Sequence, residues 1–247
     1  MRKLRFFLAL WLGKCARIAL RVLRRNATYF PGVVALKVCP DFLGQVGKPR
    51  DIIAVTGTNG KTTVSNLIAD VLTDRGYKVL TNRLGSNVAA GIATALLTGS
   101  TVFGKARYDT AVLEIDERSS KRIYPYVKPK LLVVTNLFRD SIMRNAHPAY
   151  IAWFLEQAVP RETKLVLNAD DLISCRIAPE NDRVYFAVDR LKTDVVECIN
   201  LINDLQICPV CSGELQYEYR RYHHIGKAHC KDCGFASPEP DYLGTDV

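Results

Sequence analysis

Residues 54–63 have the residue types of a phosphate-binding loop. They read AVTGTNGKTT, with two glycines followed by a lysine and threonines. Glycines let backbone N–H groups curl around an anion, and a lysine beside them reaches the terminal phosphates. A hydroxyl directly after that lysine can bind Mg²⁺. The pattern is shorter than the common P-loop, which has glycine where this chain has Val55. A plain glycine-rich turn is nevertheless a weaker interpretation, because a strand precedes the glycines and a helix follows them. The predicted ATP-binding residues here are Gly57, Thr58, Asn59, Gly60, Lys61, Thr62 and Thr63, with Thr62 as a magnesium ligand.

Acidic residues follow a second predicted strand, at residues 110–115. Glu114 lies at its carboxyl end, in the sequence LEIDE. A carboxylate in that position can bind Mg²⁺ beside the phosphates of a nucleotide. We predict that Glu114 belongs to the nucleotide site and is a magnesium ligand. Asp116 and Glu117 are rivals for this role, and either could instead cap a helix.

Polar side chains also follow the predicted strands at 131–136 and 164–167. Asn136 and Asp140 come after the first, and Asn168 after the second. In parallel sheets, ligands bind at the carboxyl ends of the strands. We therefore expect these side chains to face the same cleft, with Asn168 bonding the edge of an adenine. Ordinary turn and helix-capping chemistry is the alternative for all three.

Four cysteines form two Cys-x-x-Cys pairs near the end of the chain. The spacing between the pairs is typical of a tetrahedral zinc site, and four thiolates close the coordination sphere. His229 is a rival ligand, and a redox pair is the alternative function. We predict a structural zinc bound by Cys208, Cys211, Cys230 and Cys233.

The elements that must position these residues alternate between strands and helices. Near-continuous apolar strands are typical of a parallel sheet that is covered on both faces. The predicted fold class is α/β, a mostly parallel P-loop-type sheet with helices on both faces and an inserted four-cysteine zinc ribbon. The expected parts are an N-terminal amphipathic helix and turn-rich lead-in at 1–50, an ATP-binding domain at 51–204, the ribbon at 205–240, and the start of a further part at 241–247. Short helices are expected at 119–126 and 170–177.

The net charge of +9 is concentrated at the N-terminus. Residues 1–50 contain eleven lysines and arginines and a single acid, Asp41, so the rest of the chain is nearly neutral. This disfavours a nucleic-acid-binding face on the body.

Residues 1–25 predict a basic amphipathic helix, suited to an anionic lipid surface. Its uncharged run, residues 6–13, is far shorter than the ~20 residues that span a bilayer. Phe6, Leu10 and Leu20 break the apolar arc. The alternative is a helix docked on the protein's own body through this arc, with a solvated basic face. The predicted arc comprises Leu4, Phe7, Leu8, Trp11, Leu12, Cys15, Ile18, Ala19, Val22 and Leu23.

The loop AVTGTNGKTT resembles that of the Mur ligase superfamily, the peptidoglycan and folylpolyglutamate ligases. With the segments at 30–43, 113–117, 135–140 and 167–171 and the CPVC…CKDC ribbon, nearly the whole chain resembles the MurT-like ligase subunits of lipid II isoglutaminyl synthases. The resemblance implies ATP-dependent amidation of the D-isoglutamate α-carboxyl of lipid II through an acyl phosphate, in peptidoglycan synthesis. It also implies ammonia from a GatD-like glutamine amidotransferase subunit in a heterodimer, and a cytoplasmic location at or near the inner face of the membrane.

Two departures from that family limit what is carried over. After Arg139-Asp140 the family continues Gln-Leu-Asp-Arg-Tyr-Gly-Glu, so no role is carried over for residues 141–147. Family members also continue beyond the ribbon, where the partner contact and a catalytic acid lie, so no catalytic residue is predicted and the chain is expected to be an N-terminal and central part. The alternative functions are another Mur-type ligase that adds an amino acid, and a non-enzymatic zinc-ribbon module.

Overall fold

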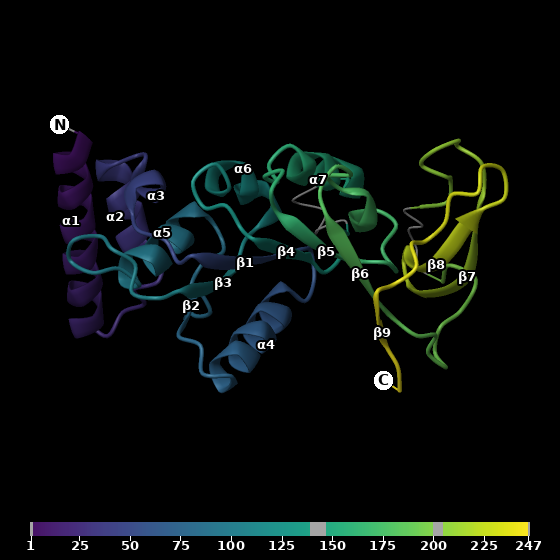
Figure 1. The fold of residues 1–247 in the computed structure, drawn as a ribbon, viewed down its shortest axis with the longest axis horizontal. Helices are drawn as coiled ribbons and strands as arrows, with labels where there is room; N and C mark the ends of the chain where they lie inside the picture. Colours follow the sequence, from purple (N-terminus) through teal and green to yellow (C-terminus); the bar gives the residue numbers. More distant parts are fainter. Residues whose placement is uncertain (1, 139–146, 200–204, 247) are drawn as a thin grey trace.

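A seven-stranded sheet forms the centre of the molecule, in a computed structural model that describes residues 2–138, 147–199 and 205–246 (Figure 1). The strand order is β2-β3-β1-β4-β5-β6-β9, and every neighbouring pair is parallel. The carboxyl ends of β3, β1, β4 and β5 are therefore adjacent at one edge. The strands are β1 (Asp51–Thr56), β2 (Val79–Thr81), β3 (Thr110–Glu114), β4 (Leu131–Val134), β5 (Lys164–Asn168), β6 (Arg183–Val188) and β9 (Tyr242–Gly244).

Helices cover both faces of this sheet. Because successive side chains of a strand point to opposite faces, Ile52 and Ala54 of β1 enter the large apolar cluster, while Ile53 and Val55 belong to a smaller one on the other face. The helix α4 (Lys61–Asp74) contributes Ala69 to the smaller cluster. The larger cluster contains residues of α5 (Ala89–Thr98), α6 (Ser120–Ile123) and α7 (Pro148–Glu156). The predicted fold class is thus confirmed.

Three helices precede the sheet: α1 (Arg2–Val22), α2 (Phe30–Val38) and α3 (Phe42–Gln45). The prediction of a turn-rich lead-in was therefore wrong over most of its length. Pro31 lies in the first turn of α2, where no N–H donor is required. Gly32 faces α5 so closely that a Cβ would collide with the carbonyl oxygen of Ala90. Both residues assist helix formation and packing here instead of interrupting them.

Helix α1 lies on the body, but not through the predicted arc. Its buried residues are Phe6, Ala9, Leu10 and Gly13, and two of these are among the three residues that break the predicted pattern. Most of the predicted arc is exposed, including Trp11 at 51%. The helix is thus docked, as the alternative predicts, but through other residues than the predicted arc, whose apolar side chains stay exposed on its outer face. Among the described residues, no helix is long and apolar enough to cross a membrane.

The ribbon is a hairpin of β7 (Leu215–Tyr222) and β8 (Ile225–Cys230), antiparallel and separate from the main sheet. After it, the chain returns to the sheet, where β9 pairs with β6, so residues 241–247 contribute a seventh strand. Two predicted helices are shorter than expected. Residues 170–177 contain only the 3-10 turn η2 (Ser174–Arg176). In place of the helix predicted at 119–126, the 3-10 turn η1 (Glu117–Ser119) is continued by the short helix α6.

Candidate nucleotide-binding site

The phosphate-binding loop connects β1 to α4, as the sequence predicts. Gly57 and Gly60 have φ values of +128° and +78°, which L side chains rarely adopt. A Cβ on Gly57 would also collide with the hydroxyl of Thr135, directly after the neighbouring strand β4. The two glycines therefore allow the tight turn and the close approach that bring the loop to the edge of the sheet.

The segment after β4 holds this loop in place. The backbone N–H of Thr58 donates to the carbonyl oxygen of Asn136 at 2.8 Å, and that of Asn59 donates to its side-chain oxygen at 3.0 Å. The hydroxyl of Thr135 donates to the carbonyl of Asn59 at 2.7 Å. Asn136 thus faces the loop, as expected for this strand end. Asp140, predicted to lie beside it, falls outside the described residues.

Lys61 at the start of α4 is paired with Glu117. The distance between its Nζ and Oε1 of Glu117 is 3.1 Å, and the same oxygen accepts the N–H of Gly57 at 2.8 Å. Burial raises the pKa of Glu117, and the charge of Lys61 opposes this shift. A carboxylate thus contacts the loop's lysine and one of its amides, which are groups that would bind a phosphate oxygen. The sequence favours Glu114 over Glu117, since no local pattern shows that the side chain of Glu117 turns toward the loop.

Thr62 and Glu114, the two predicted magnesium ligands, are in direct contact. The hydroxyl of Thr62 donates to Oε2 of Glu114 at 2.8 Å. Both offer the hard oxygen atoms that Mg²⁺ prefers, so this pair fits the ion. Two further residues hold Glu114, and no sequence pattern predicted them. Asn87 donates to Oε1 of Glu114 at 3.0 Å, and Asn82 exchanges hydrogen bonds with the backbone of Glu114. Asp116 takes the capping role, accepting two backbone N–H groups of η1.

A cavity of about 460 Å³ opens beside the loop at the ends of β4, β5 and β6. Asn168 lines it, with its amide nitrogen donating to the carbonyl of Thr135 at 3.0 Å and its oxygen accepting the N–H of Asp170 at 3.0 Å. One amide hydrogen and one oxygen lone pair stay available for a base, so an adenine contact remains a prediction. Tyr222 of the ribbon also lines the cavity. Sequence analysis missed this residue, because the ribbon is distant in sequence.

Aromatic and charged contacts hold the ribbon next to this cavity. The ring of Phe138 stacks on that of Tyr222, with centroids 5.1 Å apart. His224 bonds Asp171 at 3.0 Å with both side chains fully buried, and Asp171 also accepts the N–H of Leu137 at 2.8 Å. Asp171 therefore ties the ribbon to the same segment that supports the phosphate-binding loop.

The four predicted zinc ligands converge at the base of the ribbon. All four Sγ atoms lie within 4.8 Å of one another, and the pairs Cys208–Cys233 and Cys211–Cys230 are 3.6 and 3.5 Å apart. A tetrahedral zinc with Zn–S bonds of ~2.3 Å places its sulfurs ~3.8 Å apart, so the cluster fits this ion. Among the described residues, His229 is not part of it.

Comparisons with known proteins find one matching family model and similar ligase subunits. The model of the Mur ligase middle domain matches residues 55–190. The lipid II isoglutaminyl synthase (glutamine-hydrolyzing) subunit MurT of Staphylococcus aureus (strain COL) is 35% identical over 97% of this chain and 54% of that protein. The corresponding subunit of Streptococcus pneumoniae (strain ATCC BAA-255 / R6) is 36% identical over 97% of this chain and 53% of its own length. This chain thus spans about half the length of these relatives.

More distant similarities cover less of the chain. The UDP-N-acetylmuramoylalanine–D-glutamate ligase of Corynebacterium jeikeium (strain K411) is 30% identical over 60% of this chain and 29% of that protein. The crystal structure of MurF from Acinetobacter baumannii aligns with a TM-score of 0.48 at 18% identity, covering 62% of this chain and 34% of that one.

Proposed function

The chain belongs to the Mur ligase family through its middle domain, and from this premise we propose that it is the nucleotide-binding part of an ATP-dependent ligase that amidates lipid II. The observation that carries the proposal is the extent of the similarity to the MurT subunits, which covers 97% of this chain, against 60% for the D-glutamate ligase. The chemistry is that of the MurT-like ligases, in which the D-isoglutamate α-carboxyl becomes an amide.

The reaction requires that a carboxylate be activated, because its oxygen is a poor leaving group toward an amine. In the first step an oxygen of the substrate carboxylate attacks the γ-phosphorus of ATP, and ADP leaves with its bonding electron pair. In the second step ammonia attacks the acyl carbon, inorganic phosphate leaves, and the nitrogen loses a proton. The protein's task is to orient the reactants and to stabilise the negative charge on the phosphates.

The loop residues are suited to that task. Lys61 would exchange Glu117 for a phosphate oxygen, and the backbone N–H groups between Gly57 and the start of α4 would surround the anion. Thr62 and Glu114 would hold Mg²⁺, which when bound neutralises phosphate charge. The cavity that Asn168 and Tyr222 line would receive the base of the nucleotide.

We assign structural zinc to the four ribbon cysteines. Backbone N–H groups of Val210, Gly213 and Asp232 donate to three of the sulfurs, so the turns of the ribbon orient these ligand atoms. A metal there would fix the hairpin that carries Tyr222 to the cavity.

The remaining proposals concern partners and place. Ammonia would come from a GatD-like glutamine amidotransferase subunit in a heterodimer, in keeping with the relatives' names, which describe them as subunits of a glutamine-hydrolyzing synthase. The enzyme would act in the cytoplasm, at the inner face of the membrane. The outer face of α1 supports a peripheral contact with lipid, since Leu4, Ile18 and Val22 are 73%, 63% and 77% exposed among basic side chains.

An amidation assay tests the function. Because the chain spans about half the length of its MurT relatives, it would be joined to the C-terminal part of one of them and co-purified with a GatD-like subunit. The complex would be supplied with lipid II, glutamine and MgATP, and the stem peptide would be examined by mass spectrometry. Conversion of the carboxyl to a carboxamide that requires both ATP and glutamine is expected. Addition of a free amino acid without the partner would favour the amino-acid ligase, and salt-dependent binding of RNA or DNA by the ribbon without amidation would favour the non-enzymatic module.

A further inference from the structure

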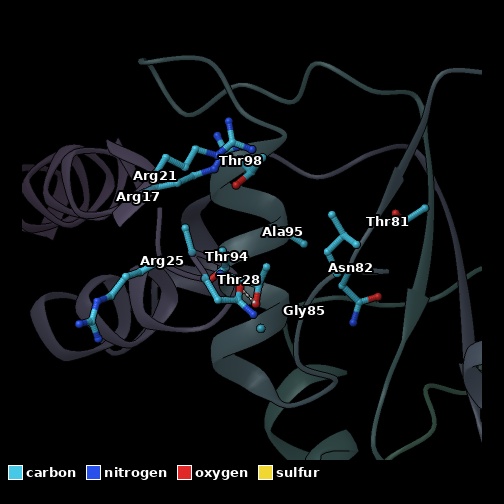
Figure 2. Close-up of a pocket in the computed structure, with 14 residues that line it drawn as sticks. Arg17, Arg21, Arg25, Thr28, Thr81, Asn82, Gly85, Thr94, Ala95 and Thr98 are labelled. Atoms are coloured by element: carbon cyan, nitrogen blue, oxygen red, sulfur yellow. Dashed lines mark hydrogen bonds between the residues drawn. The ribbon is translucent and has the colours of Figure 1, made fainter. Parts of the chain in front are cut away.

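A second cavity, of about 530 Å³, lies between the C-terminal half of α1, α5 and the loop after β2. Three arginines line it and no acidic residue does, although the cavity includes residues from several elements. Figure 2 shows Arg17 and Arg21 reaching from α1 toward Thr98 on α5, whereas the side chain of Arg25 points away from α5. The cavity is separate from the one beside the phosphate-binding loop.

The two arginines lack a counter-charge. In the part of the chain that the structure describes, neither Arg17 nor Arg21 makes an ion pair, and the nearby carbonyls of Leu97 and Ser100 at the end of α5 are already bonded by Lys14. Burial, together with the positive charge of Arg21, lowers the pKa of Arg17. Neighbouring guanidinium groups that repel each other are stabilised by a multivalent anion, and their planar donor geometry suits phosphate oxygens.

The arginines border an apolar surface. Ile18 and Val22 each follow one of the arginines in sequence and are therefore turned by ~100° around the helix axis from them. They are 63% and 77% exposed, and Leu84 at the rim of the cavity is 82% exposed. A ligand that fits both surfaces has an anionic head and an apolar tail.

We propose that this cavity binds the diphosphate group of a polyprenyl-linked substrate, with the apolar tail leaving along the outer face of α1. This rests on the proposed function, because it names the part of the substrate that the chain holds. Asn82 lines the cavity and donates to the carbonyl of Glu114 at 2.8 Å. The same loop thus connects the cavity wall to a predicted magnesium ligand, so a substrate anchored there lies beside the nucleotide.

Binding of inorganic pyrophosphate and farnesyl diphosphate, measured by calorimetry, tests the proposal. The titrations use the Lys61→Ala background, because the phosphate-binding loop is itself a site for pyrophosphate. The double variant Arg17→Gln/Arg21→Gln should weaken binding of both probes about tenfold or more, the usual effect of losing charge-assisted hydrogen bonds. The charge-matched control is Lys3→Gln/Arg5→Gln on the same helix, which should bind as the background does. Farnesyl diphosphate should bind more tightly than pyrophosphate, since its tail adds apolar contact.

Two results would overturn the proposal: undiminished binding in the Arg17→Gln/Arg21→Gln variant, or an equal loss in the control pair. Arg17→Lys/Arg21→Lys retains the charges but not the planar donor geometry, so it should bind both diphosphates more weakly than the background. This variant provides a test even if the glutamine variant folds poorly. Vesicles containing phosphatidylglycerol test whether the arginines bind a diphosphate or are attracted to any anionic membrane surface. Vesicle binding lost equally in both charge pairs, without any effect on the diphosphates, would indicate a general surface attraction and contradict the proposal.

The amidation assay separates this inference from the proposed function. If amidation occurs, the Arg17→Gln/Arg21→Gln variant should raise KM for lipid II with little change in kcat and unchanged ATP affinity. An unchanged KM would reject the cavity while the function stands. If no amidation occurs but diphosphate binding depends on the two arginines, the cavity stands and the lipid II function is wrong.

Discussion

Two parts of the molecule flank the central sheet, and they are attached in different ways (Figure 1). The N-terminal helices join the large apolar cluster, with Leu10 and Phe42 fully buried in it. The ribbon shares a smaller cluster with the body and is also held by the stack of Phe138 on Tyr222 and by buried polar pairs such as His224–Asp171. Apolar burial thus holds one end, whereas polar and aromatic pairs hold the other, whose hairpin we propose to be fixed by zinc. The comparison teaches that the two ends should respond to different perturbations.

The largest expected effect is at the metal site. Cys208→Ser should abolish zinc binding and unfold residues 206–240 locally, because so small a module has little core of its own. The sheet and N-terminal helices should keep their structure. Metal analysis with hydrogen exchange measures both effects, and Cys15→Ser, at an exposed position of α1, is the control. A protein that contains no zinc and has four freely titratable ribbon thiols would contradict the assignment.

The opposite end should respond to loss of apolar contact. Leu10→Ala removes a fully buried side chain and should lower the free energy of unfolding by about 2–5 kcal/mol. Leu4→Ala on the same helix, 73% exposed, should change it by less than about 0.5 kcal/mol. Denaturant unfolding compares the two variants. Equal effects would mean that α1 is not held by its buried face.

Nucleotide binding should depend on the loop between the two ends. Lys61→Ala removes a charge-assisted phosphate contact of about 1.5–3 kcal/mol, so ATP affinity should fall about tenfold or more. The exposed Lys78 provides a charge-matched control, and Lys78→Ala should bind ATP normally. Calorimetry with MgATP measures the affinity of both variants. An unaltered affinity in the Lys61 variant would refute the assignment of the loop.

The ribbon should contribute to the same site through Tyr222. Tyr222→Leu removes an aromatic wall of the cavity and the stack on Phe138. Aromatic contacts contribute about 0.5–1.5 kcal/mol beyond area burial, so ATP should bind several-fold more weakly. Tyr242→Leu, an exposed tyrosine of β9, is the control. If the Tyr222 variant binds ATP as tightly as the unaltered protein, the ribbon has no part in the site.

The smallest effect is the pH dependence of Glu117. Burial raises its pKa in the folded protein, so the protonated form is favoured by folding. Its stabilising contribution is present below the ordinary pKa of ~4.3 and is lost as pH rises through the higher folded value. Relative to Glu117→Gln, the unaltered protein should therefore lose stability across that window. Denaturant unfolding at a series of pH values measures the difference in the free energy of unfolding between the two proteins. This difference should stay constant with pH if the pKa of Glu117 is not shifted.

The sequence by itself determined the parallel sheet, the glycine turn between β1 and α4 and the convergence of the four cysteines. Apolar strands that alternate with helices admit few other arrangements, and glycines such as Gly57 and Gly60 signal a local backbone requirement. Short-range spacing also brings each Cys-x-x-Cys pair to a common point. These features depend on neighbours in sequence, so local patterns predict them.

The tertiary structure alone decided which residues share each surface. Phe6 and Leu10 became the docked face of α1 because α2 and α5 lie beside them, while a helical wheel sees only the helix itself. Glu117 reached Lys61 because η1 turns it inward, and Tyr222 reached the cavity beside the loop because buried contacts fix the ribbon there. The same holds for Arg17 and Arg21, which line a cavity only once α1 has packed against α5. Such placements depend on contacts between residues far apart in the chain, and their energies are set by packing that no local pattern contains.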